Sequence, residues 1–142
     1  MRDMLKWRDE YAVGLPEIDA QHRYFLSLLE ELDTLSEAVV SDRVARQILR
    51  EVDRYAYYHF NSEEVLMGIY RYPDVENQKR DHFNLLQVLD KKICDFRHQG
   101  TTVGPLVEFL GRWFFSHINE DDRELARFII RARSERRGVN VP

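Results

Sequence analysis

Cysteine is almost absent from the 142-residue chain, in which Cys94 is the only one. A single cysteine cannot form an internal disulfide, and it excludes a metal site built from several thiolates. We expect Cys94 to be a buried structural thiol. Long apolar runs are missing too, and the charged start of the chain does not resemble a signal peptide. These absences argue against a membrane protein and favour a cytoplasmic one.

An excess of basic residues is missing as well. The chain has 21 basic and 25 acidic residues, which gives a formal net charge of −4. This balance argues against nucleic acid as the main partner. The sequence also contains no phosphate-binding loop, dinucleotide fingerprint or nucleophile with a base. The common nucleotide-binding and hydrolytic enzymes are therefore not indicated.

Strand-like alternation of apolar and polar residues is absent, and four amphipathic helical segments take its place. We expect Asp19 to cap the first segment, and Ser41 with Asp42 to start the second. The third is expected at about residues 74–98 and the fourth at about residues 105–133. Long helices with short breaks predict an all-α, antiparallel up-down-up-down four-helix bundle.

The length and the 44% hydrophobic content suit one domain that buries its own core. The breaks in the helical pattern divide it into three parts. We expect a single domain over residues 1–142, with an N-terminal arm (1–17), the four-helix bundle (18–133) and a tail (134–142).

Four of the five histidines fall on the apolar faces, one in each helical segment: His22, His59, His82 and His117. A single histidine on such a face is more often a hydrogen-bonded core residue than a ligand. Four of them, accompanied by carboxylates, are hard to explain by packing, because each buried polar group needs a partner. A shared metal would satisfy them together.

Helical spacing indicates which carboxylates point inward with the histidines. Glu63 follows His59 by four residues, so both side chains project from one face, whereas Glu64 is rotated away and is expected to meet water. After His117, Asp121 has the ideal four-residue spacing and Asp122 follows by five. The face of the helix that carries the apolar residues shifts at this point. The apolar residues before and after it are more regularly spaced when Asp122, and not Asp121, is taken as the inward residue. Periodicity therefore leans to Asp122.

Imidazole and carboxylate without thiolate suit iron, manganese or zinc. Four histidines and two carboxylates are too many ligands for one tetrahedral zinc, so two metals fit better. The Glu-x-x-His spacing of ferritin-like di-iron proteins does not occur in the chain. An oxygenase of that type is therefore disfavoured.

A set of motifs spans nearly the whole sequence: Trp7, Tyr11-Ala-Val-Gly14, Ile18-Asp19-Ala-Gln21-His22, His59-Phe-Asn-Ser-Glu63-Glu64, Met67, Tyr72-Pro73, His82, and Trp113-Phe-Phe-Ser-His117-Ile118 followed by Asp122. Together they resemble the bacterial hemerythrins. The resemblance implies a non-haem centre of two iron ions, Fe2+ or Fe3+ with an oxo or hydroxo bridge, that binds dioxygen reversibly at one iron. It also implies ligands for each iron: His22 and His59 at the oxygen-binding iron, His82 and His117 at the other, and Glu63 and Asp122 bridging the two.

Gln78 departs from this pattern, because the family has a further histidine four residues before His82. An amide oxygen is a weaker donor to ferrous iron than imidazole. Three outcomes are open: Gln78 or water completes an altered di-iron centre, the second iron becomes open to peroxide or another small molecule, or that iron is lost. We favour the first.

Apolar residues near the metal positions are mostly core residues. Four of them are also expected to line a dry pocket beside the oxygen-binding iron: Phe25, Trp113, Phe114 and Ile118. The sequence therefore predicts a protein that binds dioxygen or a related small ligand for storage, delivery or sensing. The alternatives are a di-iron peroxidase or oxidase opened at Gln78, and a metal-dependent sensory bundle without oxygen carriage. The chain offers no sign of a protein partner's identity.

Overall fold

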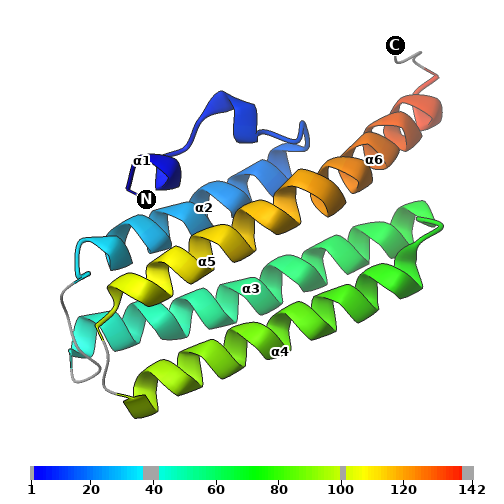
Figure 1. Cartoon of the computed structure of the whole chain (residues 1–142). Helices are drawn as coiled ribbons and strands as arrows, with labels where there is room; N and C mark the ends of the chain where they lie inside the picture. The colour runs from blue at the N-terminus through cyan, green and yellow to red at the C-terminus, as the bar shows by residue number, and fades with distance from the viewer. Residues whose placement is uncertain (1, 37–41, 100–101, 139–142) are drawn as a thin grey trace.

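Four long helical rods form the body of the computed structural model, which describes residues 2–36, 42–99 and 102–138 (Figure 1). The side chains of Arg2, Ile118 and Asn119 lie outside this description. The rods are α2 (Pro16–Asp33), α3 (Arg43–Tyr70), α4 (Val75–Gln99), and a rod made of α5 (Gly104–His117) and α6 (Arg123–Arg136). They pack antiparallel, and none of the described residues forms a strand. The predicted four-helix bundle is confirmed.

Two helix starts show how far local signals predict a boundary. Asp42 caps α3 as predicted, since its carboxylate accepts a hydrogen bond from the Ala45 backbone N at 2.9 Å; Ser41 lies outside the described residues. The prediction of Asp19 as a cap is wrong, because α2 begins at Pro16, a residue suited to a first turn. Asp19 instead accepts from the backbone N of Val13 at 2.8 Å and of Gly14 at 3.2 Å.

The arm before α2 lies along the bundle and is held to it at both ends (Figure 1). It contains a short helix, α1 (Arg2–Leu5), and a 3-10 turn, η1 (Asp9–Tyr11). The side chains of Leu5 and Leu15 are fully buried. Arg123 donates hydrogen bonds to backbone carbonyl oxygens of the arm at 2.6 and 3.2 Å. The arm therefore closes over the core next to α2 and α6.

The rod of α5 and α6 is interrupted by a π-helical turn, η2 (Ile118–Asp122), which the sequence did not predict. In an α-helix, a residue five positions on is rotated by about 140° from the first. A π-helical turn contains more residues than an α-helical one, so a residue five positions on returns close to the same face. This turn follows His117 and ends at Asp122, and the two side chains therefore point into the bundle together.

Two apolar clusters fill the interior, and a polar layer separates them. One cluster includes Leu29, Leu49 and Leu110, and the other includes Ile18 and Ile129. Each rod passes from one cluster to the other through the buried polar side chains described below. The fold thus places polar groups where water is excluded on both sides, which is costly unless they find partners.

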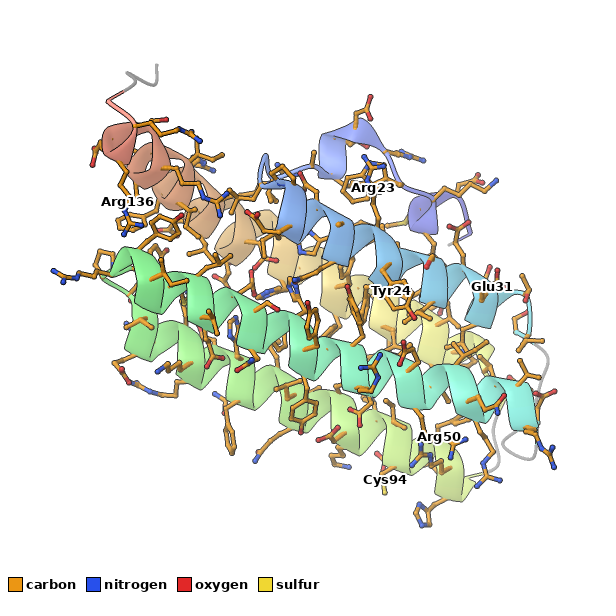
Figure 2. All side chains as sticks on the ribbon, turned by 180° about the vertical axis from the view of Figure 1, so that it is seen from behind. Arg23, Tyr24, Glu31, Arg50, Cys94 and Arg136 are labelled. Atoms are coloured by element: carbon orange, nitrogen blue, oxygen red, sulfur yellow. The ribbon has the colours of Figure 1, made fainter. Side chains whose placement is uncertain are left out.

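Cys94 corrects the expectation of a buried thiol, because its side chain is exposed on α4 (Figure 2). It lies between buried Ile93 and buried Phe96, but rotation about the helix axis turns it outward. Its Sγ is 3.6 Å from Nδ1 of His98, which is also exposed. None of the helices in the described residues is long and apolar enough to cross a membrane.

Candidate metal centre

The polar layer gathers the side chains that the sequence singled out as ligands. Each rod contributes one buried histidine, and α3 and the π-helical turn add one buried carboxylate each. Glu63 is 0% exposed and Asp122 is 2% exposed. The six side chains brought together are His22, His59, Glu63, His82, His117 and Asp122.

Asp122 faces histidines on two sides. Its Oδ2 lies 2.7 Å from Nε2 of His22 and 3.3 Å from Nε2 of His59. Its Oδ1 lies 2.8 Å from Nε2 of His117. The two oxygens of one carboxylate are therefore divided between two groups of imidazoles, which is the arrangement that a bridging ligand needs.

Glu63 contacts an overlapping set of imidazoles. Its Oε1 lies 3.3 Å from Nε2 of both His82 and His117, and 3.4 Å from Nε2 of His59. Its Oε2 is buried and has no hydrogen-bond partner among the described residues. A buried carboxylate oxygen without a partner is costly, and a bound cation would satisfy it.

The pKa shifts in the polar layer show that its buried carboxylates favour a positive charge beside them. Burial lowers the pKa of His117, but Asp122, Asp121 and Glu63 outweigh it and hold this pKa well above its ordinary value. Burial would raise the pKa of Asp122, yet His117 and the other hydrogen-bonding neighbours hold it well below its ordinary value. For His22, burial prevails and lowers the pKa. The two buried carboxylates thus favour a protonated, positively charged imidazole. A bound metal cation can supply that positive charge instead of the proton.

The donor set fits a metal that takes nitrogen and oxygen ligands. The ligand atoms of His59, Glu63, His117 and Asp122 all lie within 4.8 Å of one another. His82 and His22 extend this group on opposite sides through their contacts with Glu63 and Asp122. Four imidazole nitrogens and two carboxylates match iron, manganese or zinc. The residues present therefore fit the metal that the sequence predicted.

Gln78 is buried, as expected from its place on the His82 stripe. Its side-chain Nε2 donates to Oδ2 of Asp74 at 3.5 Å. A hydrogen bond from His117 is the main cause that lowers the pKa of Asp121, and Gln78 adds a smaller contribution of the same sign. Within the described part of the chain, no hydrogen bond joins Gln78 to a histidine. Its amide nitrogen is thus directed to carboxylates at the edge of the layer.

Sequence reasoning missed the residues that hold the imidazole rings in place. Oε1 of Gln21 accepts a hydrogen bond from Nδ1 of His59 at 2.7 Å, and Oε2 of Glu64 accepts one from Nδ1 of His82 at 2.9 Å. Such contacts fix ring orientation and raise ligand basicity. Glu64, expected to meet water, is only 26% exposed on its side chain because it makes this contact.

A usable signal for these residues was present in the sequence. Gln21 precedes His22, Glu64 follows Glu63, and Asp121 precedes Asp122. A helical neighbour of an inward residue is rotated by about 100°, which aims it at the ring of an adjacent helix. Asp121 differs, since the ring that it approaches is on its own rod: its Oδ2 lies 3.7 Å from Nδ1 of His117, four residues earlier.

Replacing Gln21 by leucine is expected to weaken metal binding by about 10–100-fold, because His59 loses the acceptor that orients its ring. Competition against a chromophoric chelator measures this change. Gln47→Leu is the matched control, because Gln47 is exposed on α3. Gln21→Glu keeps an acceptor and should restore most of the affinity. Equal affinities in Gln21→Leu and Gln47→Leu would contradict the role of Gln21.

A small, mostly apolar cavity adjoins the layer. Its volume is about 10 Å³, close to the minimum of about 10–15 Å³ that holds one water-sized molecule. Three of the four expected pocket residues line it, while the side chain of Ile118 lies outside the described residues. The complete lining is Gln21, His22, Phe25, Ala56, His59, Phe60, Trp113, Phe114 and His117.

Comparisons with known proteins agree with this geometry. The sequence profile described as "Hemerythrin HHE cation binding domain" matches residues 13–129. A bacteriohemerythrin of Stenotrophomonas maltophilia is 32% identical over 127 residues, which cover 87% of this chain and 80% of that protein. A bacteriohemerythrin of Clostridium acetobutylicum is 26% identical over 85% of this chain and 98% of its own length. A hemerythrin-like protein of Naegleria gruberi is 25% identical over 82% of this chain and 86% of its own length. The chain belongs to the hemerythrin family of HHE cation-binding domains.

Proposed function

We propose that the polar layer holds two iron ions and that the protein binds dioxygen reversibly, for storage, delivery or sensing. His22 and His59 would hold one iron, His82 and His117 the other, and Glu63 and Asp122 would bridge them. The two-sided contacts of Asp122 support this division, because its Oδ2 faces His22 and His59 while its Oδ1 faces His117.

The observation that carries the proposal is the position of the small cavity. His22, His59 and His117 line it, whereas His82 does not. A small ligand would therefore reach both histidines of the His22 and His59 pair, but only one histidine of the other pair. Because the cavity is about 10 Å³ in volume and largely walled by aromatic rings, it suits a small uncharged molecule such as dioxygen.

The protein side chains have separate tasks around this cavity. When bound, the iron ions supply the reversible redox chemistry of oxygen binding. Phe25, Phe114 and Trp113 exclude water from the side of the cavity that they wall. Gln21 keeps Nε2 of His59 directed into the layer by accepting from Nδ1. The aromatic walls leave little room for water as a proton source, which favours the release of the ligand unchanged.

The proposal is tested with iron-loaded protein that has been reduced without oxygen. Oxygen should produce a visible absorption change, and removal of oxygen should reverse it. The Phe25→Asp variant, which places a charge in the cavity wall, should lose reversibility while it retains iron. If fully iron-loaded, reduced protein shows no oxygen-dependent spectral change, the binding function fails.

Gln78 is expected to weaken, but not abolish, iron binding at the His82 and His117 side. Gln78→His should tighten the weaker of two iron-binding steps by about tenfold or more, because an imidazole replaces an amide. Elemental analysis and chelator competition measure this change. Gln87→His is the control, since Gln87 is exposed on the same helix. One iron per chain in the native protein, with two only in Gln78→His, would show instead that the second site is disabled.

A second candidate function is turnover of peroxide at an open position on the Gln78 side. Two contacts of Gln78 favour it: the amide nitrogen donates to Asp74 at 3.5 Å, and Gln78 contributes to the lowered pKa of Asp121. An amide directed to these carboxylates leaves the expected ligand position beside His82 open. Peroxide consumption with a reducing dye, abolished in His59→Ala and reduced in Gln78→His, would support this enzyme. Undiminished turnover in Gln78→His would exclude Gln78 as its cause.

A further inference from the structure

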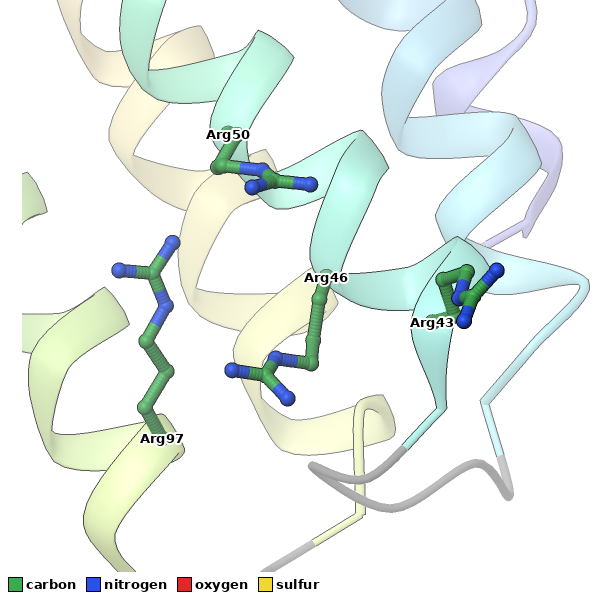
Figure 3. Close-up of a pocket in the computed structure, with 4 residues that line it drawn as sticks. All are labelled: Arg43, Arg46, Arg50 and Arg97. Atoms are coloured by element: carbon green, nitrogen blue, oxygen red, sulfur yellow. The ribbon is translucent and has the colours of Figure 1, made fainter.

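Four arginines meet at one end of the bundle, far along α3 from the polar layer. Arg43, Arg46 and Arg50 lie on one face of α3 at spacings of three and four, and Arg97 is in the last turns of α4. They line an open cavity of about 400 Å³, here called the arginine pocket. Figure 3 shows Arg97 extending from α4 toward Arg46 and Arg50. The pocket brings four positive charges together in a protein with a net charge of −4.

The acidic residues close in sequence to the pocket arginines have other hydrogen-bond partners. Asp42, beside Arg43, accepts from the backbone N of Ala45 at 2.9 Å. Glu51 accepts hydrogen bonds from Arg54 and from the hydroxyl of Tyr24, and Asp95 pairs with Lys91 at 3.1 Å. Within the described part of the chain, the four pocket arginines form no ion pair. By contrast, the guanidinium group of Arg133 reaches Glu17 at 2.7 Å. The positive charge of the pocket is therefore not neutralised by direct ion pairs among the described residues.

Asp53 is the acid that Arg97 influences at longer range. Burial raises the pKa of Asp53 to about 7, a hydrogen bond with Asp90 acts in the same direction, and Arg97 opposes both. Arg97 therefore acts on Asp53 through its electrostatic field, and no ion pair joins the two among the described residues.

The positions of the arginines on α3 conflict with helix electrostatics. The first turn of α3 contains Arg43 and Arg46 and has no acidic residue. The N-terminus of a helix is the positive end of its dipole and favours acids, so cations there are unfavourable. Arg46 and Arg50 also repel each other across one turn. Only Arg97, near the end of α4, suits its own helix. Rules broken together at one place are typical of a functional site.

We propose that the arginine pocket binds a small anion that carries several phosphate groups. Guanidinium groups match phosphate oxygens through paired hydrogen bonds. Four arginines exceed the charge of a single phosphate, and the pocket volume falls within the usual range of small-ligand sites, about 300–1,000 Å³. Its lining is arginine, so charge rather than apolar burial selects the ligand. This site does not depend on metal in the polar layer.

Isothermal titration calorimetry on the full chain at low salt tests the proposal with inorganic tripolyphosphate, ATP, orthophosphate and poly-glutamate. Tripolyphosphate should bind at least about tenfold more tightly than orthophosphate, because more guanidinium contacts form at once. It should also raise the melting temperature. Equal affinities for tripolyphosphate and ATP mean that phosphates alone are recognised. Tighter ATP binding means that the pocket also contacts the nucleoside.

Paired variants decide whether the pocket is responsible. Arg46→Gln with Arg97→Gln should weaken tripolyphosphate binding at least about tenfold and remove the thermal shift. Arg127→Gln with Arg131→Gln removes the same charge from exposed positions on α6 and should change affinity less than about twofold. Circular dichroism checks that both variants fold. The proposal is overturned by equal losses in the two variants, by equal affinity for orthophosphate, by binding of poly-glutamate alone, or by no binding.

Discussion

Replacing Asp122 by alanine is expected to lower the metal affinity of the protein by more than about 100-fold. Loss of a residue that only orients a ligand already costs about 10–100-fold, and Asp122 contacts Nε2 of His22, His59 and His117 directly. Elemental analysis after loading should show chains largely depleted of iron. Circular dichroism of the same samples separates this effect from unfolding.

Two neighbouring acids provide matched controls for Asp122. Asp121→Ala should reduce affinity by no more than about 10–100-fold, because Asp121 lies near the outer nitrogen of His117. Glu120→Ala should have little effect, since Glu120 is exposed. The expected order of loss is therefore Asp122, Asp121, Glu120. An order in which Asp121 leads would show that the regular helical spacing, and not the π-helical turn, determines the ligand.

The metal-free protein gives a separate test of the same contacts. His117 has a pKa raised above 6.5 despite its burial, because Asp122, Asp121 and Glu63 favour the protonated ring. A raised pKa stabilises the fold fully below the unfolded value, and this contribution is lost as pH rises through the folded value. In Asp122→Asn, the pKa of His117 should fall, and nuclear magnetic resonance of the ring nitrogens reports it. An unchanged titration would contradict the Asp122 contact.

The second large effect is expected from Phe60→Ala, which should destabilise the metal-free protein by about 3–5 kcal/mol. The Phe60 ring is 1% exposed and stacks on His82 at a centroid distance of 4.2 Å. It also packs edge-on against His117 and Trp113. Its removal leaves a void beside the polar layer, where neighbouring rings have little freedom to collapse. Denaturant unfolding followed by circular dichroism measures the loss.

Phe83→Ala is the control for Phe60, because it removes the same ring from a position that is 60% exposed. Its free energy of unfolding should change by no more than about 0.5 kcal/mol. A similar loss in the free energy of unfolding for both variants would contradict the role of the buried Phe60 ring in stabilising the core. Phe60 also lines the small cavity, so its packing connects the stability of the fold with the shape of the proposed oxygen pocket.

The fold and the central residues were accessible from periodicity. A histidine recurs on each apolar stripe, and Glu63 follows His59 by one turn, which together indicate a metal-binding bundle. The helical repeat determines which side chains share a face, and short breaks determine that neighbouring helices run antiparallel. Gln78 was placed in the interior by the same argument, and it is buried there.

Features that depend on departures from a uniform helix were not accessible in this way. The π-helical turn brings Asp122 within 2.8 Å of His117, but its formation depends on local backbone geometry that a fixed rotation per residue does not describe. Cys94 was misplaced for another reason: the expectation rested on the residue type, whereas regular helical rotation turns this position outward.

Sequence alone was sufficient for the fold class and the inward histidines, because these follow from spacing within each helix, and for the family resemblance, because the motifs carry it. Only the tertiary structure showed which atoms meet, namely those of Gln21 with His59 and of Glu64 with His82, and that Arg97 lines one cavity with the arginines of α3. The physical reason is that contacts between helices depend on their relative rotation and depth of packing. The spacing of residues within one helix does not determine its rotation or its depth of packing relative to the next helix.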